Sequence, residues 1–201
     1  GPQHWWPADT PFEVAVGAVL TQNTAWTNVE RAIASLKAAG PLDATTLYRM
    51  DPGELGELIR PAGYFNVKAR RLQALCAFLL TEGDGHVEGL AHRETAELRA
   101  ALLGIKGVGE ETADSILLYA LERPVFVVDA YTRRIFERLH LLEPGLGYGA
   151  IQAAFEAALP RDRTLFNEYH ALIVALGKDY CKPKPRCTAC PIRDLCPSAA
   201  T

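Results

Sequence analysis

Residues 103–109, Leu-Gly-Ile-Lys-Gly-Val-Gly, connect two segments in which apolar residues recur at helical spacing. Gly107 and Gly109 permit a tight turn and leave backbone N–H groups free at the start of the second helix. Such groups can bind a phosphate oxygen. An ordinary interhelical hairpin is the alternative. Glu110 and Glu111 favour this alternative, because they put negative charge where a phosphate would lie. As acids in the first turn of the helix, they could also simply complement the helix dipole.

Helical spacing continues on both sides of this hairpin, and alternating β-branched runs are rare. The short apolar segment 124–128 is expected to be extended and buried without joining a sheet. The sequence therefore predicts an all-α protein. Its helices are expected at 11–20, from a cap at Thr24 or Thr27 to Gly40, and at 42–50, 52–61, 66–81, 94–103, 110–121, 130–139, 148–159 and 164–180.

A carboxylate stands where the extended segment meets the next helix, in Val-Val-Asp-Ala-Tyr-Thr-Arg-Arg, residues 127–134. Asp129 is either a helix N-cap or a functional carboxylate held rigidly against a cleft. Arg133 or Arg134 could then contact a backbone phosphate from the next turn.

Four of the five cysteines lie in one stretch near the C-terminus, with gaps of five, two and five residues: Cys181, Cys187, Cys190 and Cys196. Four thiolates can bind zinc or a [4Fe–4S] cluster. Zinc sites usually have two close pairs, whereas only the central pair is close here, so the spacing favours the cluster. Residues 178–196 also carry five basic side chains against two acidic ones, which indicates a local basic patch.

The composition excludes other classes of protein. The chain has 201 residues, 49% hydrophobic and 22% charged, which excludes disorder and a coiled-coil rod. Its formal net charge of −3 excludes a global positive field, so any nucleic-acid footprint must be local. No apolar run approaches the roughly 18 residues of a membrane span, and no secretion signal is evident. We expect a soluble, intracellular protein with no membrane partner.

Taken together and in this order, these features resemble the endonuclease III family of helix-hairpin-helix DNA glycosylases. The likeness covers nearly the whole chain. It rests on Ala18-Val-Leu-Thr-Gln-Asn-Thr24, Gly63-Tyr-Phe-Asn-Val-Lys-Ala69, the hairpin with Thr112-Ala113, Val128-Asp129, and the cysteine loop with its KPRC and CPIRDLC strings.

The resemblance implies a two-domain α fold with DNA bound in a cleft between the domains. A six-helix barrel that contains the helix-hairpin-helix would span residues 12–122. An iron–sulfur domain with a [4Fe–4S] cluster on the four cysteines would comprise residues 1–11 and 123–201.

The resemblance also implies roles for single residues. Asp129 falls on the catalytic aspartate, Gln22 on the residue that fills the space left by the flipped nucleotide, and Tyr64 on the wedge into the opposite strand. Further DNA contacts are expected from the hairpin, the helix after Asp129 and the cysteine loop: Lys106, Gly107, Gly109, Arg133, Lys182, Lys184 and Arg186.

One position departs from the family's bifunctional members, which carry a lysine two residues after the second hairpin glycine. Glu111 stands there, and a carboxylate cannot form the Schiff base of the lyase reaction. This departure, with Trp5-Trp6-Pro7, resembles the 3-methyladenine branch of the family. Trp5, Trp6, Trp26 and Phe65 are candidate walls of a base pocket, although each could be a plain core or rim aromatic.

The predicted function is therefore a monofunctional base excision repair N-glycosylase that flips and removes damaged bases, with preference for alkylated purines. Its partner would be damaged double-stranded DNA, bound by a monomer in the cytoplasm in association with the nucleoid. Two alternatives stay open: a bifunctional glycosylase/AP lyase acting on oxidised pyrimidines, with Lys106 as the nearest spare amine, and a non-catalytic damaged-DNA-binding protein.

Overall fold

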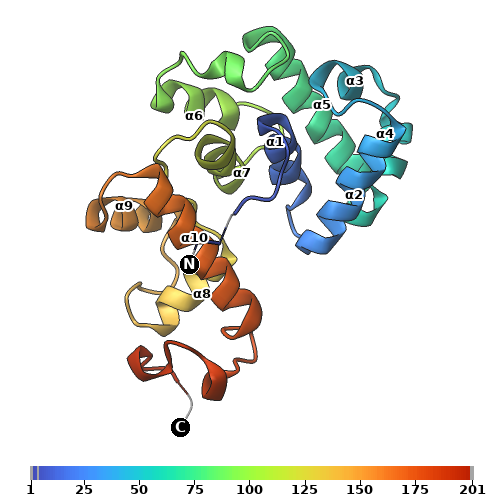
Figure 1. Ribbon diagram of the computed structural model, residues 1–201. Helices are drawn as coiled ribbons and strands as arrows, with labels where there is room; N and C mark the ends of the chain where they lie inside the picture. The colour runs from blue at the N-terminus through green and yellow to red at the C-terminus, as the bar shows by residue number, and fades with distance from the viewer. Residues whose placement is uncertain (1, 4, 200–201) are drawn as a thin grey trace. The chain divides into compact units, whose positions relative to one another are not determined.

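A computed structural model describes residues 2–3 and 5–199 (Figure 1). These residues form helices and loops and contain no strand, which confirms the all-α prediction. The α-helices are α1 (Pro11–Leu20), α2 (Trp26–Ala39), α3 (Ala44–Arg49), α4 (Pro52–Leu58), α5 (Phe65–Glu82), α6 (Thr95–Leu103), α7 (Glu110–Ser115), α8 (Ala130–Arg138), α9 (Tyr148–Ala158) and α10 (Arg163–Asp179). In this part of the chain, no helix is both long and apolar enough to cross a membrane.

The chain divides into two compact units. One comprises residues 6–123 and holds α1 to α7, coloured blue to green in Figure 1. The other comprises residues 1–5 and 124–201 and holds α8 to α10, coloured yellow to red. We call them the hairpin unit and the cysteine unit, after the features they contain.

In the hairpin unit, helix starts follow the capping signals of the sequence. Thr10 caps α1 by accepting a hydrogen bond from the Glu13 N–H at 3.1 Å. Asp51 caps α4 by accepting from two N–H groups of its first turn. In each case proline follows the cap and starts the helix with its fixed φ. The long helix α5 then packs against both α3 and α4.

One predicted detail of the hairpin unit is wrong. Neither Thr24 nor Thr27 caps α2, which begins after Ala25 without a side-chain cap. The predicted helix 110–121 is confirmed as helical, but it is α-helical only to Ser115 and continues as a π-helical turn, Ile116–Ala120, that packs against α1. π-Helical turns are rare, and those that occur are frequently found at functional sites.

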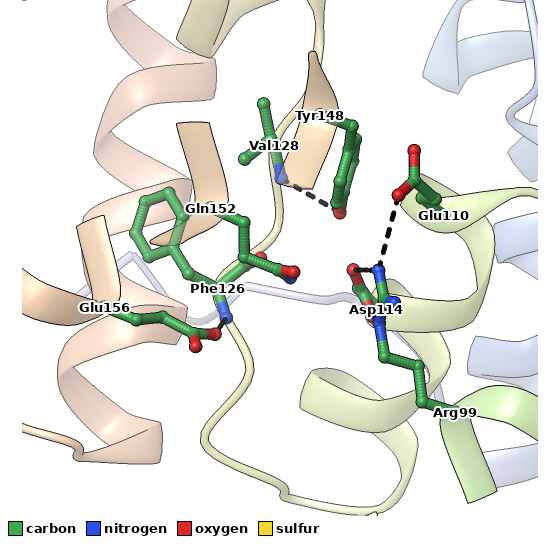
Figure 2. A network of polar contacts seen from close by, with 8 residues as sticks. All are labelled: Arg99, Glu110, Asp114, Phe126, Val128, Tyr148, Gln152 and Glu156. Atoms are coloured by element: carbon green, nitrogen blue, oxygen red, sulfur yellow. Dashed lines mark hydrogen bonds and ion pairs between the residues drawn. The ribbon is translucent and has the colours of Figure 1, made fainter. Parts of the chain in front are cut away.

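In the cysteine unit, the predicted extended segment is buried and belongs to no sheet. Side chains of α9 bind its backbone instead (Figure 2): Glu156 accepts from the Phe126 N–H, Gln152 donates to the Phe126 carbonyl, and the Tyr148 hydroxyl accepts from the Val128 N–H. These bonds satisfy buried polar groups that a sheet would otherwise pair. The Phe126 ring stacks on Phe155, with 4.2 Å between ring centroids. The segment that leads to Asp129 is therefore firmly held.

Candidate functional site

The hairpin between α6 and α7 turns at a glycine that no other residue could replace without strain. Gly107 has φ +91°, and a Cβ there would lie 2.5 Å from Arg71 Cγ. Gly109 differs from expectation: its φ of −98° is open to any residue, and nothing lies within 4 Å of where its Cβ would be. The tight turn therefore depends on Gly107 and not on Gly109.

A buried ion pair joins the two helices of the hairpin (Figure 2). The guanidinium of Arg99, on α6, donates to both carboxylate oxygens of Asp114, on α7, at 2.7 and 2.9 Å. Glu110 approaches the same guanidinium at 3.8 Å. Because Asp114 is fully buried, this bidentate contact fixes how the helices meet at the turn. Sequence reasoning did not predict the pair.

Gln22, which follows α1, is bound to the hairpin. Its Nε2 donates to the Gly107 carbonyl at 3.0 Å and to Thr112 Oγ1 at 2.9 Å, while its Oε1 accepts from Arg71. These three contacts fix the orientation of the amide. The hairpin and Gln22 thus form one connected group within the hairpin unit.

Tyr64 stands at the N-cap of α5 with its side chain 73% exposed. Its backbone is left-handed, with φ 46° and ψ 33°, and Gly63 before it also has positive φ. A bulky non-glycine residue in this region is strained, and such strain is concentrated at functional sites. An exposed aromatic residue therefore stands on a constrained backbone.

Lys106 and Glu111 are both exposed, on the turn and in the first turn of α7. They lie on the same hairpin as Gln22's partners. The exposure of Lys106 leaves its amine accessible to solvent.

In the cysteine unit, Asp129 is the N-cap of α8 and is 9% exposed. Its Oδ1 accepts from the Thr132 N–H at 2.7 Å and from Thr132 Oγ1 at 2.9 Å. Its Oδ2 lies 3.5 Å from Nε2 of the buried His170. Burial disfavours the charged carboxylate, but His170 and the bonds from Thr132 outweigh that effect and hold the pKa of Asp129 below its ordinary value. Asp129 is therefore a helix cap and also a buried, ionised carboxylate. Its Oδ2 takes no part in the cap.

The four clustered cysteines line one pocket of the cysteine unit, with about 440 Å³ of space between atoms, including space open to solvent. Two arginines one turn apart on α8 hold the loop. Arg134 donates to the Cys181 carbonyl at 2.7 Å, and Arg138 donates to Cys181 Sγ at 3.3 Å and to the Lys182 carbonyl at 2.7 Å. In residues 2–3 and 5–199, no three His, Cys, Asp or Glu side chains are close enough to hold one metal ion.

Comparison with known proteins gives this arrangement a family. Residues 16–161 match the HhH-GPD superfamily of base excision DNA repair proteins. The chain belongs to this superfamily. Over 98% of its length it is 51% identical to "Putative DNA repair glycosylase MJ1434" of Methanocaldococcus jannaschii, 90% of which is covered. Over 92% of its length it is 29% identical to endonuclease III of Sulfolobus acidocaldarius, 81% of which is covered.

Solved HhH-GPD structures agree. The H. pylori 3-methyladenine DNA glycosylase MagIII, bound to 1,N6-ethenoadenine, superposes with a TM-score of 0.75 at 31% identity, covering 87% of each chain. An endonuclease III–DNA complex superposes with a TM-score of 0.82 at 24% identity, covering 96% of this chain and 85% of that one. The predicted family and fold are thus confirmed, and the superfamily's proteins are base excision repair enzymes that act on DNA.

The aromatic residues that we predicted as pocket walls in this HhH-GPD protein lie in different places. Trp6 and Trp26 pack edge to face, with 5.1 Å between ring centroids, over Gly17 of α1. Phe65 packs against α4 and has the Arg60 guanidinium 5.6 Å from its ring. Trp5 falls in the cysteine unit. Trp6 and Trp26 are thus two of the predicted wall residues that the structure brings into contact.

The basic residues predicted to contact DNA also differ in their surroundings. Lys184 and Arg186 are exposed on the cysteine loop, and Lys182 is half-buried there. Arg133 is half-buried and donates to the Leu146 carbonyl of its own unit. A phosphate contact by Arg133 would have to share or replace that bond, whereas the loop side chains are accessible.

Proposed function

We propose that this HhH-GPD protein is a monofunctional DNA N-glycosylase that removes alkylated purines from double-stranded DNA. The observation that carries the proposal is the buried, ionised Asp129 carboxylate, whose Oδ1 is occupied by the helix cap while Oδ2 lies outside it. A carboxylate held in this way is ready to act on a developing positive charge without reorganising.

The reaction follows from that charge. The damaged nucleotide leaves the base stack, and the C1′–N bond breaks with its electron pair leaving on the base. The sugar becomes oxocarbenium-like, and the negative charge of Asp129 stabilises it. Water, which Asp129 could orient, then adds to C1′ and loses a proton to solvent.

The absence of a lysine at position 111 supports the monofunctional assignment. A lyase forms a Schiff base between an amine and C1′, and the Glu111 carboxylate has no amine to offer. The nearest amine on the hairpin is that of Lys106, which is exposed. If the Lys106 amine formed the Schiff base, the protein would be a bifunctional glycosylase/lyase, which is the main competing function.

Two observations support alkylated purines as the substrate class. N3- and N7-alkylated purines carry a positive charge, which weakens their glycosidic bond and attracts them to aromatic rings, worth about 0.5–2 kcal/mol. Trp6 and Trp26 form such an aromatic surface, and Trp5 and Phe65 are the further candidates. The 31%-identical structural relative is a 3-methyladenine glycosylase bound to a modified adenine.

We also propose a [4Fe–4S] cluster on Cys181, Cys187, Cys190 and Cys196. In a zinc site, four sulfurs lie about 2.3 Å from one metal ion and hence close to one another. In a cubane, each thiolate binds a different iron, so the sulfurs need only surround a cavity. The four thiols line one pocket, and their sequence gaps of five, two and five residues favour the cluster over zinc. The cluster would fold the basic loop.

The proposed division of labour follows the two units. The hairpin, with Lys106, Gly107 and Gly109, and the loop, with Lys182, Lys184 and Arg186, would bind phosphates, and Gln22 and Tyr64 would enter the duplex. The barrel domain would correspond to the hairpin unit and the iron–sulfur domain to the cysteine unit. The protein would act as a monomer on DNA in the cytoplasm.

The test is base release from a panel of otherwise identical duplexes containing an alkylated purine, thymine glycol or uracil, detected after alkali cleavage. We expect release from the alkylated duplex, and a fall of roughly 10²-fold in Asp129→Asn, the scale of losing one preorganised electrostatic group. Asparagine keeps the cap to Thr132, so lesion binding should persist. Preference for thymine glycol would contradict the substrate class, and wild-type turnover by Asp129→Asn would reduce Asp129 to a cap. Binding without any release would favour the non-catalytic alternative.

A further inference from the structure

Lys68 of α5 is a lysine in the core of the hairpin unit. Its side chain is 1% exposed, and it lies on the same helix face as Leu72 and Leu79. Its Nζ donates to two backbone carbonyls, Leu20 and Ala62, each at 2.8 Å. One ammonium group therefore ties together two segments that are 42 residues apart in the chain.

Both carbonyls belong to the last residue of a helical segment. Leu20 ends α1, and Ala62 ends the short 3-10 helix Arg60–Ala62. Terminal carbonyls lack partners within their own helix and carry the negative end of its dipole, so a buried cation suits them. Lys68 thus acts as a C-terminal cap for two helices at once.

The two segments lead directly to the two residues proposed to enter DNA. Gln22 follows Leu20 by two residues, and Tyr64 follows Ala62 by two. Each segment also contains a non-glycine residue in the left-handed region, Asn23 with φ 54° and Tyr64 with φ 46°. Strained backbone of this kind persists only where surrounding contacts hold it in place.

We propose that Lys68 is a positioning residue that sets Gln22 and Tyr64 in register for insertion at a flipped nucleotide. This inference rests on the proposed function, because it concerns recognition of a damaged site. The buried ammonium is an expensive way to fill a core position, since an apolar side chain of equal length would avoid its desolvation. Burial lowers the pKa of Lys68 to about 8, with a smaller effect from Arg71. A neutral amine keeps two N–H donors, the number of carbonyls it serves.

The test replaces Lys68 with methionine, which keeps length and removes the donors. We would measure Kd, at one salt concentration, for an undamaged duplex and for the same duplex with a stable tetrahydrofuran abasic analogue. A 2-aminopurine opposite the analogue would report insertion by its fluorescence. We expect the preference for the analogue to fall about tenfold to a hundredfold, the scale of a small misplacement of contact groups. Affinity for undamaged DNA should change little, because the hairpin is intact.

Leu72→Ala is the matched control, since Leu72 is buried one turn further along the same helix. It should lower stability while leaving the preference and the fluorescence change intact. In a Gln22→Ala/Tyr64→Ala background, Lys68→Met should have no further effect on the preference.

The other outcomes of this experiment would overturn either the role of Lys68 or the proposed function. An unchanged preference in folded Lys68→Met would overturn the proposal, as would an equal loss in Leu72→Ala. If Lys68→Met does not fold, Lys68→Gln, which keeps N–H donors on a shorter stem, replaces it; failure of both to fold would make Lys68 a general core residue and overturn the positioning role. A wild-type protein with no preference for the analogue would instead count against the proposed function.

Discussion

Removing the Asp114 carboxylate should loosen the hairpin by a predictable amount. Asp114 is fully buried and accepts two hydrogen bonds from Arg99, whose side chain is 26% exposed. Losing one partner of a buried pair costs about 3–5 kcal/mol, and the partial exposure of Arg99 puts Asp114→Ala near the lower end, about 3 kcal/mol. For a chain of this length that corresponds to a fall in Tm of roughly 6–12 °C.

The measurement is thermal unfolding followed by circular dichroism, with Kd for undamaged DNA measured on the same samples. Glu57→Ala is the control, because it removes an ion pair to Arg60 whose side chains are 62% and 66% exposed, and such a pair contributes less than about 1 kcal/mol. Arg99→Leu/Asp114→Leu should recover part of the lost stability, since neither charge is then buried. If Asp114→Ala unfolds at the same temperature as Glu57→Ala, the ion pair does not brace the hairpin.

Further predictions concern the cluster, the lyase reaction and the pH dependence. Purified protein should be brown with about four iron atoms per chain, and Cys187→Ser should lose the iron and bind DNA more weakly; stoichiometric zinc would contradict the cluster. Borohydride should trap little covalent enzyme on an abasic site, and efficient trapping that disappears in Lys106→Ala would identify a displaced lyase amine. The lowered pKa of Asp129 keeps it ionised above its ordinary value of 3.8, so base release should lose no activity through Asp129 until the pH falls below that value. Thr132→Val removes one of the bonds that lower this pKa, so the acid limb should move to higher pH, and an unmoved limb would assign it to another group.

Where the sequence carries a strong local signal, the helices begin where predicted. Thr10-Pro11 and Asp51-Pro52 place a capping oxygen before a residue with fixed φ, and both helices start there. The start of α2 was mispredicted because Thr24 has another partner. Its hydroxyl accepts from the Asn28 side chain at 3.4 Å and does not cap the helix backbone. A threonine in the sequence shows that a hydroxyl is available to cap a helix, but the fold decides which donor that hydroxyl binds.

In the candidate site, too, local features could be predicted from the sequence and contacts between distant residues could not. Asp129 and the four cysteines could be chosen as candidates because the signal for each lies in adjacent residues: an apolar run before an acid, and four thiols in one loop. Arg99 could not be assigned a partner, since its contact to Asp114 joins two helices across the turn. The role of Arg138 likewise depends on a loop 43 residues further along the chain. Contacts between distant segments leave no local pattern in a single sequence.

Lys68 differs from Arg99 and Arg138, because the sequence alone indicates that its side chain is buried. It stands four residues before Leu72, on the apolar stripe that continues through Leu75 and Leu79. A charged residue at that spacing must either reach solvent or find buried acceptors. On a helix that begins next to a proposed DNA-contacting residue, the terminal carbonyls of the preceding segments are the nearest acceptors to consider. A lysine on the buried face of such a helix therefore predicts, before the structure is known, that its amine binds the backbone of the segments that carry the DNA-contacting residues.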